Sequence, residues 1–350
     1  MAEAAQPAAP ATQPVLSEAK PVHRRDDGRK PALYHRKVGR GPCGIFRCVG
    51  NHRPTNYMIL CQRPFNRDCK LPNCNEDFIS PMFRDHVMPA RVFWYNTFFY
   101  IYKTIYAWAV EEAMGAHGMI NYVDARTSYM DGLVVIAAAQ SIDQVVVIAS
   151  GYCTRAYRLH RAGVKFFEVD LPPVVERKIG LVDAVLPDKE KYPRPAYVPT
   201  DLADVGALAG NLAGAGFDAS RPALFTCEGI FCYLPQAVVD CVVAQVSEIA
   251  APGSRLCLDL IPRGLLEGRV RPSRGFVNGR DALAARGEPL LSGFDTSPED
   301  FAAYWRPHGW AVVELLDARA LAAKQLPHLK WSDRKPPLLD FMHFAELRKE

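Results

Sequence analysis

The chain has 350 residues, of which 49% are hydrophobic, enough to bury a substantial core in one large domain or one domain with additions. Its formal net charge is +4, and residues 1–40 alone carry eight Lys or Arg against four Asp or Glu, so the remainder is balanced. A nucleic-acid-binding enzyme usually spreads a basic face over its folded body, so this distribution argues against a nucleic-acid partner.

Residues 1–40 are rich in Ala, Pro and charge, and we expect a disordered basic tail there. The start of the chain lacks the apolar core of a signal peptide, and its acidic residues argue against a transit peptide. We therefore expect a cytoplasmic protein whose ten cysteines are reduced thiols.

Residues 41–90 form a cysteine-rich N-terminal extension. The spacing is C-x4-C from Cys43, then Cys61, then C-x7-C-x4-C ending at Cys74. Two x4 pairs, with His52 as an alternative ligand, could supply a tetrahedral metal site. That spacing is loose for zinc and leaves one cysteine over, so we favour ordinary thiols and expect no metal.

The segment 92–110, VFWYNTFFYIYKTIYAWAV, is long enough to suggest a membrane span, but Asn96 and Lys103 argue against one. We expect an amphipathic helix laid over the core, within a helical lid at 91–140 that opens a domain spanning 91–350. The residues expected to face the core are Phe98, Ile101, Tyr102, Ile105, Tyr106 and Ala109.

From residue 141 onward strand-like and helical runs alternate, which predicts an α/β fold with helices on both sides of a parallel sheet. The clearest helix is 235–250, where Val239, Val242, Val243, Val246 and Ile249 form one face. The predicted strands are 145–149, 165–170, 196–200, 223–227, 255–260, 311–316 and 338–346.

The ends of the first four strands bring candidate ligand-binding residues to one edge of the sheet. Gly151 follows the first strand, and Asp170, nineteen residues later, ends the second at the position of a ribose-binding carboxylate. Asp201 and Glu228 follow the third and fourth. Each residue also has a structural explanation, because Gly151 suits a tight turn and both aspartates suit helix caps.

A pyrophosphate ligand is disfavoured, because Ala149 and Thr154 occupy positions where a dinucleotide-binding turn needs glycine. A nucleoside cofactor without phosphates fits better. One glycine permits close approach, carboxylates suit the sugar and an amino group, and a cation suits a carboxylate. S-adenosylmethionine has these groups.

Four segments together resemble the leucine carboxyl methyltransferase family, and the resemblance extends over about 120–347. It implies a doubly wound, seven-stranded Rossmann-like methyltransferase sheet whose last strand, 338–346, lies antiparallel beside 255–260. The segments are RTSYMDGLV (126–134), VVVIASGYCTRAYRL (145–159), FFEVDLPPVVERK (166–178) and LFTCEGIFCYLP (224–235).

The family pattern implies that Arg126 binds the methionine carboxylate of S-adenosylmethionine, where a guanidinium suits bidentate pairing. Without the resemblance, an ion pair of Arg126 with Asp124 or Asp131 would be the simpler interpretation. Gly151 lets the backbone approach the cofactor, and Glu228 lies at the cofactor pocket, facing the methionine end.

At the other end of the cofactor, the same pattern implies that Asp170 takes the ribose hydroxyls. It also puts Asp201 and Leu202 near the adenine, where the carboxylate can accept a hydrogen bond from the exocyclic amine.

Two positions depart from the family's usual G-x-G-x-D-T-R. Ala149 replaces the first glycine, and Cys153 replaces the aspartate, which removes an anion from the first turn of the following helix. A non-catalytic protein that retains the fold is therefore one alternative.

The leading hypothesis is an S-adenosylmethionine-dependent methyltransferase acting on a carboxylate of a protein or small molecule. A carboxylate is already ionised near pH 7, so we nominate no catalytic acid or base. A nicotinamide-dependent oxidoreductase is the less favoured alternative. Substrate contacts are expected from 92–110 and from the arginine-rich stretch 262–294, which also suits a solvated loop.

Overall fold

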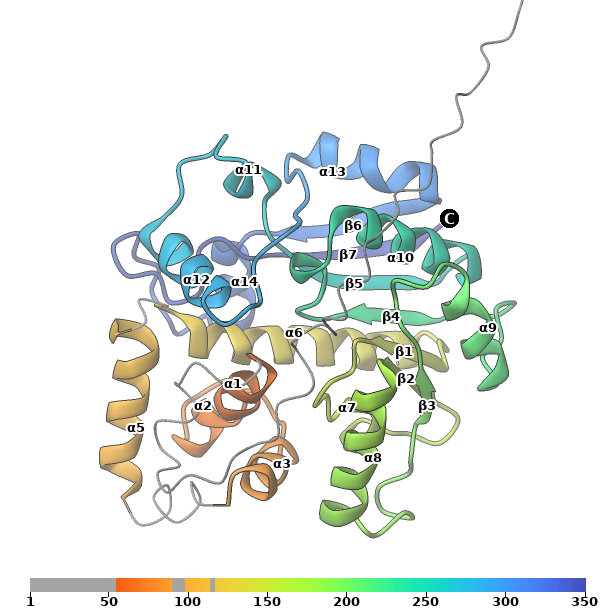
Figure 1. Cartoon of the computed structure of the whole chain (residues 1–350), viewed down its shortest axis with the longest axis horizontal. Helices are drawn as coiled ribbons and strands as arrows, with labels where there is room; N and C mark the ends of the chain where they lie inside the picture. Colours follow the sequence, from red (N-terminus) through yellow and green to blue (C-terminus); the bar gives the residue numbers. More distant parts are fainter. Residues whose placement is uncertain (1–54, 90–97, 114–116) are drawn as a thin grey trace, which may run out of the picture. The chain divides into compact units, whose positions relative to one another are not determined.

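Seven strands form one mixed sheet (Figure 1) in the computed structural model, which describes residues 55–89, 98–113 and 117–350. The order across the sheet is β3-β2-β1-β4-β5-β7-β6. It reverses between β1 and β4, so these two strands flank the switch point at which α/β sheets bind ligands. The strands are β1 Gln144–Ile148, β2 Lys165–Asp170, β3 Ala196–Pro199, β4 Leu224–Cys227, β5 Arg255–Leu260, β6 Trp310–Leu316 and β7 His343–Lys349.

The strand predictions are confirmed, with six strands starting and ending within one residue of expectation. The seventh runs from His343 to Lys349 rather than from 338 to 346, so its position was predicted only in part. It runs antiparallel between β5 and β6, with Leu258 opposite Ala345, as the family resemblance implies. All five residues of β1 are buried, as expected of a parallel strand covered on both faces.

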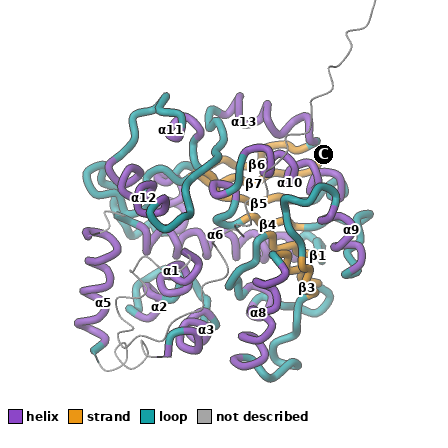
Figure 2. Tube along the Cα trace, in the orientation of Figure 1, coloured by secondary structure: helices purple, strands orange, loops and turns teal. Residues whose placement is uncertain are grey.

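Helices cover both faces of this sheet (Figure 2). On one face, α9, α10 and α13 pack against β1, β2, β4 and β5 in the largest core cluster. On the other, α6 packs against β1 and, with α14, against β5 and β7. The helices that pack in these clusters are α6 Met119–Ala139, α9 Ala207–Gly214, α10 Gln236–Ile249, α13 Pro298–Trp305 and α14 Ala318–Gln325.

The predicted buried face of the helix at 235–250 is confirmed in α10, where all five apolar residues are buried. The remaining elements are α1 Thr55–Gln62, α2 Phe65–Asp68, α3 Ser80–Val87, α5 Phe99–Trp108, π-helix η2 Ala109–Ala113, α7 Arg155–Arg158, α8 Pro172–Val185, η3 Phe231–Tyr233, α11 Arg263–Leu266, α12 Arg274–Ala284 and η4 Arg306–His308.

The helix expected at 92–110 presents a different face from the one predicted. Residues 92–97 lie outside the described residues, and α5 begins at Phe99. Tyr106 and Val110 are buried, whereas Phe98, Ile101 and Ile105 are 45%, 61% and 49% exposed, so the prediction for those three exposed residues was wrong. The segment is apolar or aromatic nearly all round, and a periodic pattern therefore could not distinguish its two faces. No described helix is long and apolar enough to span a membrane.

The part of the cysteine-rich stretch that the structure describes folds as α1, α2 and α3. These helices pack against α6 and α8, beside the carboxyl ends of the first strands (Figure 1). Residues 1–54, with Cys43 and Cys48, lie outside the described residues. Among those described, Cys61, Cys69 and Cys74 form no group with other side chains that could hold a metal ion.

Candidate functional site

The turn after β1 brings Gly151 and Asp170 together. The backbone N–H of Gly151 donates to Asp170 Oδ2 at 2.7 Å. Gly151 has φ of +42°, and a Cβ there would meet only the Ala149 carbonyl oxygen, at 3.9 Å. This position therefore favours glycine for its backbone conformation, and the space beside it is open to a ligand.

Asp170 is the last residue of β2, and its carboxylate accepts hydrogen bonds from two backbone amides. Its second oxygen, Oδ1, accepts the N–H of Leu171 at 2.8 Å. The pKa of this carboxyl lies above the usual aspartate value, because burial raises it by more than the hydrogen bonds from the Gly151 and Leu171 amides lower it. Asp170 does not cap α8, whose N-cap is Leu171 without a side-chain bond, so the capping explanation for this residue is wrong.

Glu228, directly after β4, lies among three arginines. Its Oε1 is 3.2 Å from Arg63 Nη2 and 3.1 Å from Arg126 Nε, and its Oε2 pairs with Arg155 Nη1. Burial alone would raise the pKa of this carboxyl, but Arg155, Arg126 and Arg63 together hold it well below the usual glutamate value. Glu228 is therefore ionised throughout the physiological range.

Arg126 projects from α6 into this cluster. Its second partner is Asp259 of β5, with Nη1 to Oδ2 at 3.0 Å. Arg126 is 5% exposed and does not pair with Asp124 or Asp131, so the simpler interpretation of an ion pair with those residues was wrong. Gly229 makes room for the guanidinium, because a Cβ there would lie 2.9 Å from Nη1.

Asp201 and Leu202 follow β3 at the same edge of the sheet. Asp201 is exposed and accepts the N–H of Ala203 at 3.0 Å, and it does not cap α9, whose N-cap is Gly206. Leu202 is 8% exposed and belongs to the large core cluster. The structure thus brings Arg126 and Glu228 into contact, joins Gly151 to Asp170, and leaves Asp201 with local contacts.

Arg155 and Arg158, on α7, extend the charged cluster. Arg155 Nε lies 2.7 Å from Asp131 Oδ1, and Arg158 Nη1 lies 2.6 Å from Asp131 Oδ2. Arg158 Nε is also 3.5 Å from Asp77 Oδ1. The network contains four guanidinium groups and four carboxylates, so its formal charges balance. Its carboxylates are Asp77, Asp131, Glu228 and Asp259.

Six of the eight members of this network were not among the predicted site residues, namely Arg63, Asp77, Asp131, Arg155, Arg158 and Asp259. Asp259 carried a signal, because an acidic residue inside the apolar strand RLCLDL must find a partner when buried. Arg63 and Asp77 lie in the cysteine-rich stretch, where the sequence offered only a cysteine spacing to interpret and no motif for an organic cofactor. Arg63 meets Glu228 across 165 residues of sequence.

Cys153 lies on the core side of the turn. It is 5% exposed and packs in an apolar cluster with Val134, Val145 and Ala156. Its Sγ also accepts a hydrogen bond from Arg155 Nη1 at 3.5 Å. The thiol thus has a packing role, which weakens the case for a non-catalytic protein that only retains the fold.

A family model described as leucine carboxyl methyltransferase matches residues 74–247. The chain is 34% identical over 216 residues to a protein of Mycolicibacterium paratuberculosis assigned as an S-adenosyl-L-methionine-dependent methyltransferase, covering 60% of this chain and 67% of the relative. A similarly assigned protein of Mycolicibacterium smegmatis is 32% identical over 225 residues, covering 63% of this chain and 72% of the relative.

Two crystal structures share the fold. One is a protein from Thermobifida fusca assigned as a methyltransferase, with a TM-score of 0.50 and 18% identity, covering 83% of this chain and 94% of that chain. The other is a DUF574 family protein from Streptomyces avermitilis, with a TM-score of 0.50 and 17% identity, covering 83% and 97%.

Proposed function

Because the chain belongs to the leucine carboxyl methyltransferase family and is an S-adenosylmethionine-dependent methyltransferase, we propose that it methylates a carboxylate on a protein or small molecule. The observation that carries the proposal is the joint placement of Gly151 with Asp170 and of Arg126 with Glu228 at the ends of β1, β2 and β4. Two charged groups of opposite sign suit a ligand that carries both an ammonium and a carboxylate.

The residues present fit S-adenosylmethionine. Asp170 would hold the ribose hydroxyls, and the open backbone beside Gly151 would allow close approach. Arg126 would hold the methionine carboxylate and Glu228 the ammonium, since Glu228 is kept ionised by its arginines. Asp201 and Leu202 would lie near the adenine. A pyrophosphate fits poorly, because Ala149 and Thr154 stand where a phosphate-binding turn needs glycine.

When bound, S-adenosylmethionine supplies an activated methyl group. The chain's own task is to orient an acceptor toward that methyl and to exclude water from the pocket. A carboxylate acceptor is ionised near pH 7 and needs no general base. We therefore assign that role to none of the titratable residues at the site.

The cofactor is tested by calorimetric titration of the full chain with S-adenosylmethionine, S-adenosylhomocysteine and NAD. We expect the first two to bind and NAD not to bind. Arg126→Met should weaken S-adenosylmethionine binding at least tenfold, because a charge-assisted bond is lost. Binding of NAD alone would overturn the proposal in favour of an oxidoreductase. If none of the three ligands binds, a non-catalytic protein that retains the fold is favoured.

The acceptor class is tested by incubating the protein with cofactor labelled on the methyl group and a cell extract. A methyl ester hydrolyses in base and releases volatile labelled methanol, whereas N-methyl and S-methyl products keep their label. We expect base-labile label in the presence of wild-type protein and, at a cofactor concentration below the dissociation constant, at least tenfold less with Arg126→Met. Label that is stable to base would contradict carboxylate methylation while leaving cofactor binding intact.

A further inference from the structure

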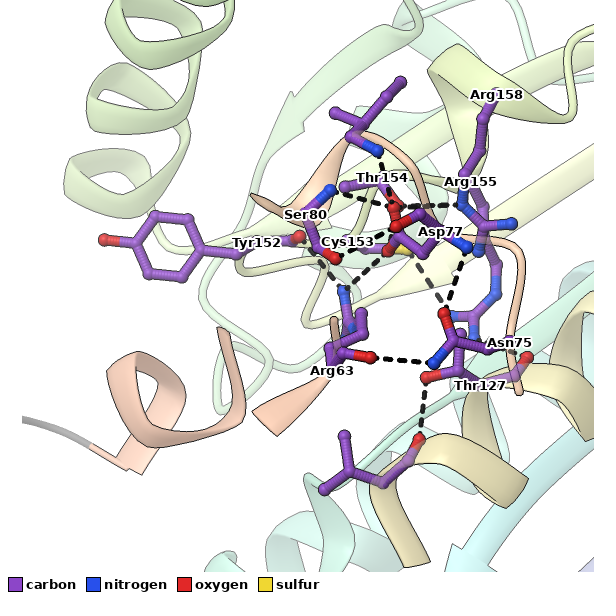
Figure 3. Close-up of polar contacts among 12 residues, drawn as sticks. Arg63, Asn75, Asp77, Ser80, Thr127, Tyr152, Cys153, Thr154, Arg155 and Arg158 are labelled. Carbon is purple, nitrogen blue, oxygen red and sulfur yellow. Dashed lines mark hydrogen bonds and ion pairs between the residues drawn. The ribbon is translucent and has the colours of Figure 1, made fainter. Parts of the chain in front are cut away.

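The turn after β1 contains no acidic side chain of its own. Residues 149–153 read Ala-Ser-Gly-Tyr-Cys, and the short helix α7 that follows brings Arg155 and Arg158. The carboxylate that accepts a hydrogen bond from Thr154, the residue before α7, belongs to Asp77, 77 residues earlier in the chain. Asp77 Oδ2 accepts a hydrogen bond from Thr154 Oγ1 at 2.7 Å (Figure 3). Arg158 Nε donates to the same Thr154 hydroxyl at 2.9 Å.

Asp77 is held firmly by its own segment. Its Oδ1 accepts the backbone N–H of Ile79 at 3.1 Å and of Ser80 at 2.9 Å, at the start of α3. Its own N–H donates to Asn75 Oδ1 at 3.0 Å, and Asn75 Nδ2 donates to the Arg63 carbonyl oxygen at 2.7 Å. The carboxylate is fully buried, so its orientation is set by these contacts rather than by solvent.

Arg63 provides a second tie between the same segment and the turn. Its Nη1 donates to the carbonyl oxygen of Tyr152 at 3.2 Å and lies 3.9 Å from Asp77 Oδ2. Figure 3 shows Arg63 in contact with both Tyr152 and Asp77, and Asp77 in contact with Thr154. Three successive parts of the turn are thereby fixed: Gly151 by Asp170, Tyr152 by Arg63 and Thr154 by Asp77. Two of the three fixing side chains come from residues 55–89.

We propose that Asp77 is a positioning residue for the turn that binds S-adenosylmethionine, acting through Thr154, so that the N-terminal segment is part of the cofactor site. This inference rests on the proposed function, since it concerns the same turn. Asp77 would act without touching the cofactor, by fixing the backbone on which Gly151 lies. A competing explanation is that Asp77 serves only to start α3.

The substitution Asp77→Asn separates these explanations. The amide keeps an oxygen at the Oδ1 position for Ile79 and Ser80, so the start of α3 survives. It loses the acceptor for Thr154 and the negative charge that faces Arg63 and Arg158. Thr154→Val removes the hydrogen bond to Asp77 from the other side with little change of shape, and it also removes the one from Arg158 Nε. Thr154→Ser keeps the hydroxyl and both hydrogen bonds.

We expect S-adenosylhomocysteine, titrated calorimetrically into the full chain, to bind Asp77→Asn and Thr154→Val roughly tenfold more weakly than wild type, and Thr154→Ser nearly as well as wild type. The double variant should bind no more weakly than the weaker single variant, because both changes remove the hydrogen bond between Asp77 and Thr154. Hydrogen exchange of the amides of residues 151–154 should be faster in both single variants, without any ligand present.

Glu346→Gln is the matched control, because it breaks a buried ion pair with Arg255 in the sheet. It should lower the free energy of unfolding and leave S-adenosylhomocysteine affinity unchanged. The inference is overturned if Asp77→Asn loses stability as the control does and binds like wild type. Should that variant fail to fold, Thr154→Val alone decides, and wild-type affinity in it overturns the inference. Failure of wild type to bind at all would instead overturn the proposed function.

Discussion

Glu228 shows how one side chain can serve two purposes at this site. Its carboxylate is shared by Arg63, Arg126 and Arg155, which come from three separate parts of the chain. Removing one member of a buried ionic cluster leaves its partners without compensation, which is far costlier than losing a surface pair. Glu228, which we propose holds the cofactor's ammonium, therefore also stabilises the fold by joining these three parts of the chain.

We expect Glu228→Gln to lower the free energy of unfolding at pH 7 by about 3 kcal/mol. The folded-state pKa of Glu228 lies below its ordinary value of 4.5, so its stabilising contribution is present above pH 4.5 and is lost as pH falls below it. The difference between variant and wild type should therefore shrink in urea titrations between pH 4.5 and pH 3. Glu248→Gln, at an exposed position of α10, should show no such difference.

Ala149 has a left-handed backbone, with φ of +54°, which costs a non-glycine residue roughly 1–2 kcal/mol. Glycine removes that strain. It also gives the unfolded chain more conformational entropy, which destabilises the folded state by about 0.5–1 kcal/mol. Ala149→Gly should therefore raise the free energy of unfolding, by about 1.5 kcal/mol at most. Ser141→Gly, where φ is +63° at the end of α6, is the control outside the turn. A loss of stability in both variants would show that neither position is strained.

The candidate residues that sequence reasoning found share one property: each follows a predicted strand or carries a family motif. Asp170 and Glu228 could be located because strand ends converge on one edge of a parallel sheet. Arg63 and Asp77 could not, because nothing in their local sequence indicates a contact with residues 77 to 165 positions away. Such contacts depend on the packing of α1 and α3, which local patterns do not encode.

Among the elements, α5 and η2 differ most from expectation. Ile101, Ile105 and Trp108 are exposed on α5, while Tyr106 and Val110 pack with Cys61, Phe65 and Ile120. The strands were easier to predict, because a buried parallel strand is a short apolar run bounded by turn residues. A helix that is apolar on all sides has no such contrast.

The observed orientation of α5 predicts unequal effects of two substitutions. Ile105→Ser should change the free energy of unfolding by less than about 0.5 kcal/mol, because the side chain is 49% exposed. Val110→Ala should lower it by roughly 1–3 kcal/mol, because its methyl groups are buried. Urea denaturation measures both. A larger loss of stability in Ile105→Ser would indicate that Ile105 is buried in the core, as the sequence pattern predicted.

At the scale of the molecule, the sheet and its helices follow from alternation of strand and helix, and the antiparallel β7 follows from the family resemblance. The packing of residues 55–89 follows from neither. Cofactor binding and order in that segment should be linked, because ligands stabilise the folded state on which their site depends.

This link predicts a protection pattern in limited proteolysis. Trypsin should cut after the exposed Lys70 more slowly when S-adenosylhomocysteine is present, because Arg63 and Asp77 contact the turn that we propose binds the cofactor. Cutting after Lys189 or Lys191, in an exposed loop before β3, should be unaffected. Equal protection at both places would indicate only a global gain of stability.

The position of β7 also constrains how the protein is made. Strand β5 pairs with β7 on its outer side, but residues 261–342 must be synthesised between them. At about 5–20 residues per second, the nascent chain displays an unpaired β5 edge for roughly 4–16 s. That edge carries Leu256, Leu258 and Leu260, and open apolar edges recruit other chains. The yield of folded protein should therefore depend on translation speed after Leu260 and on chaperone supply.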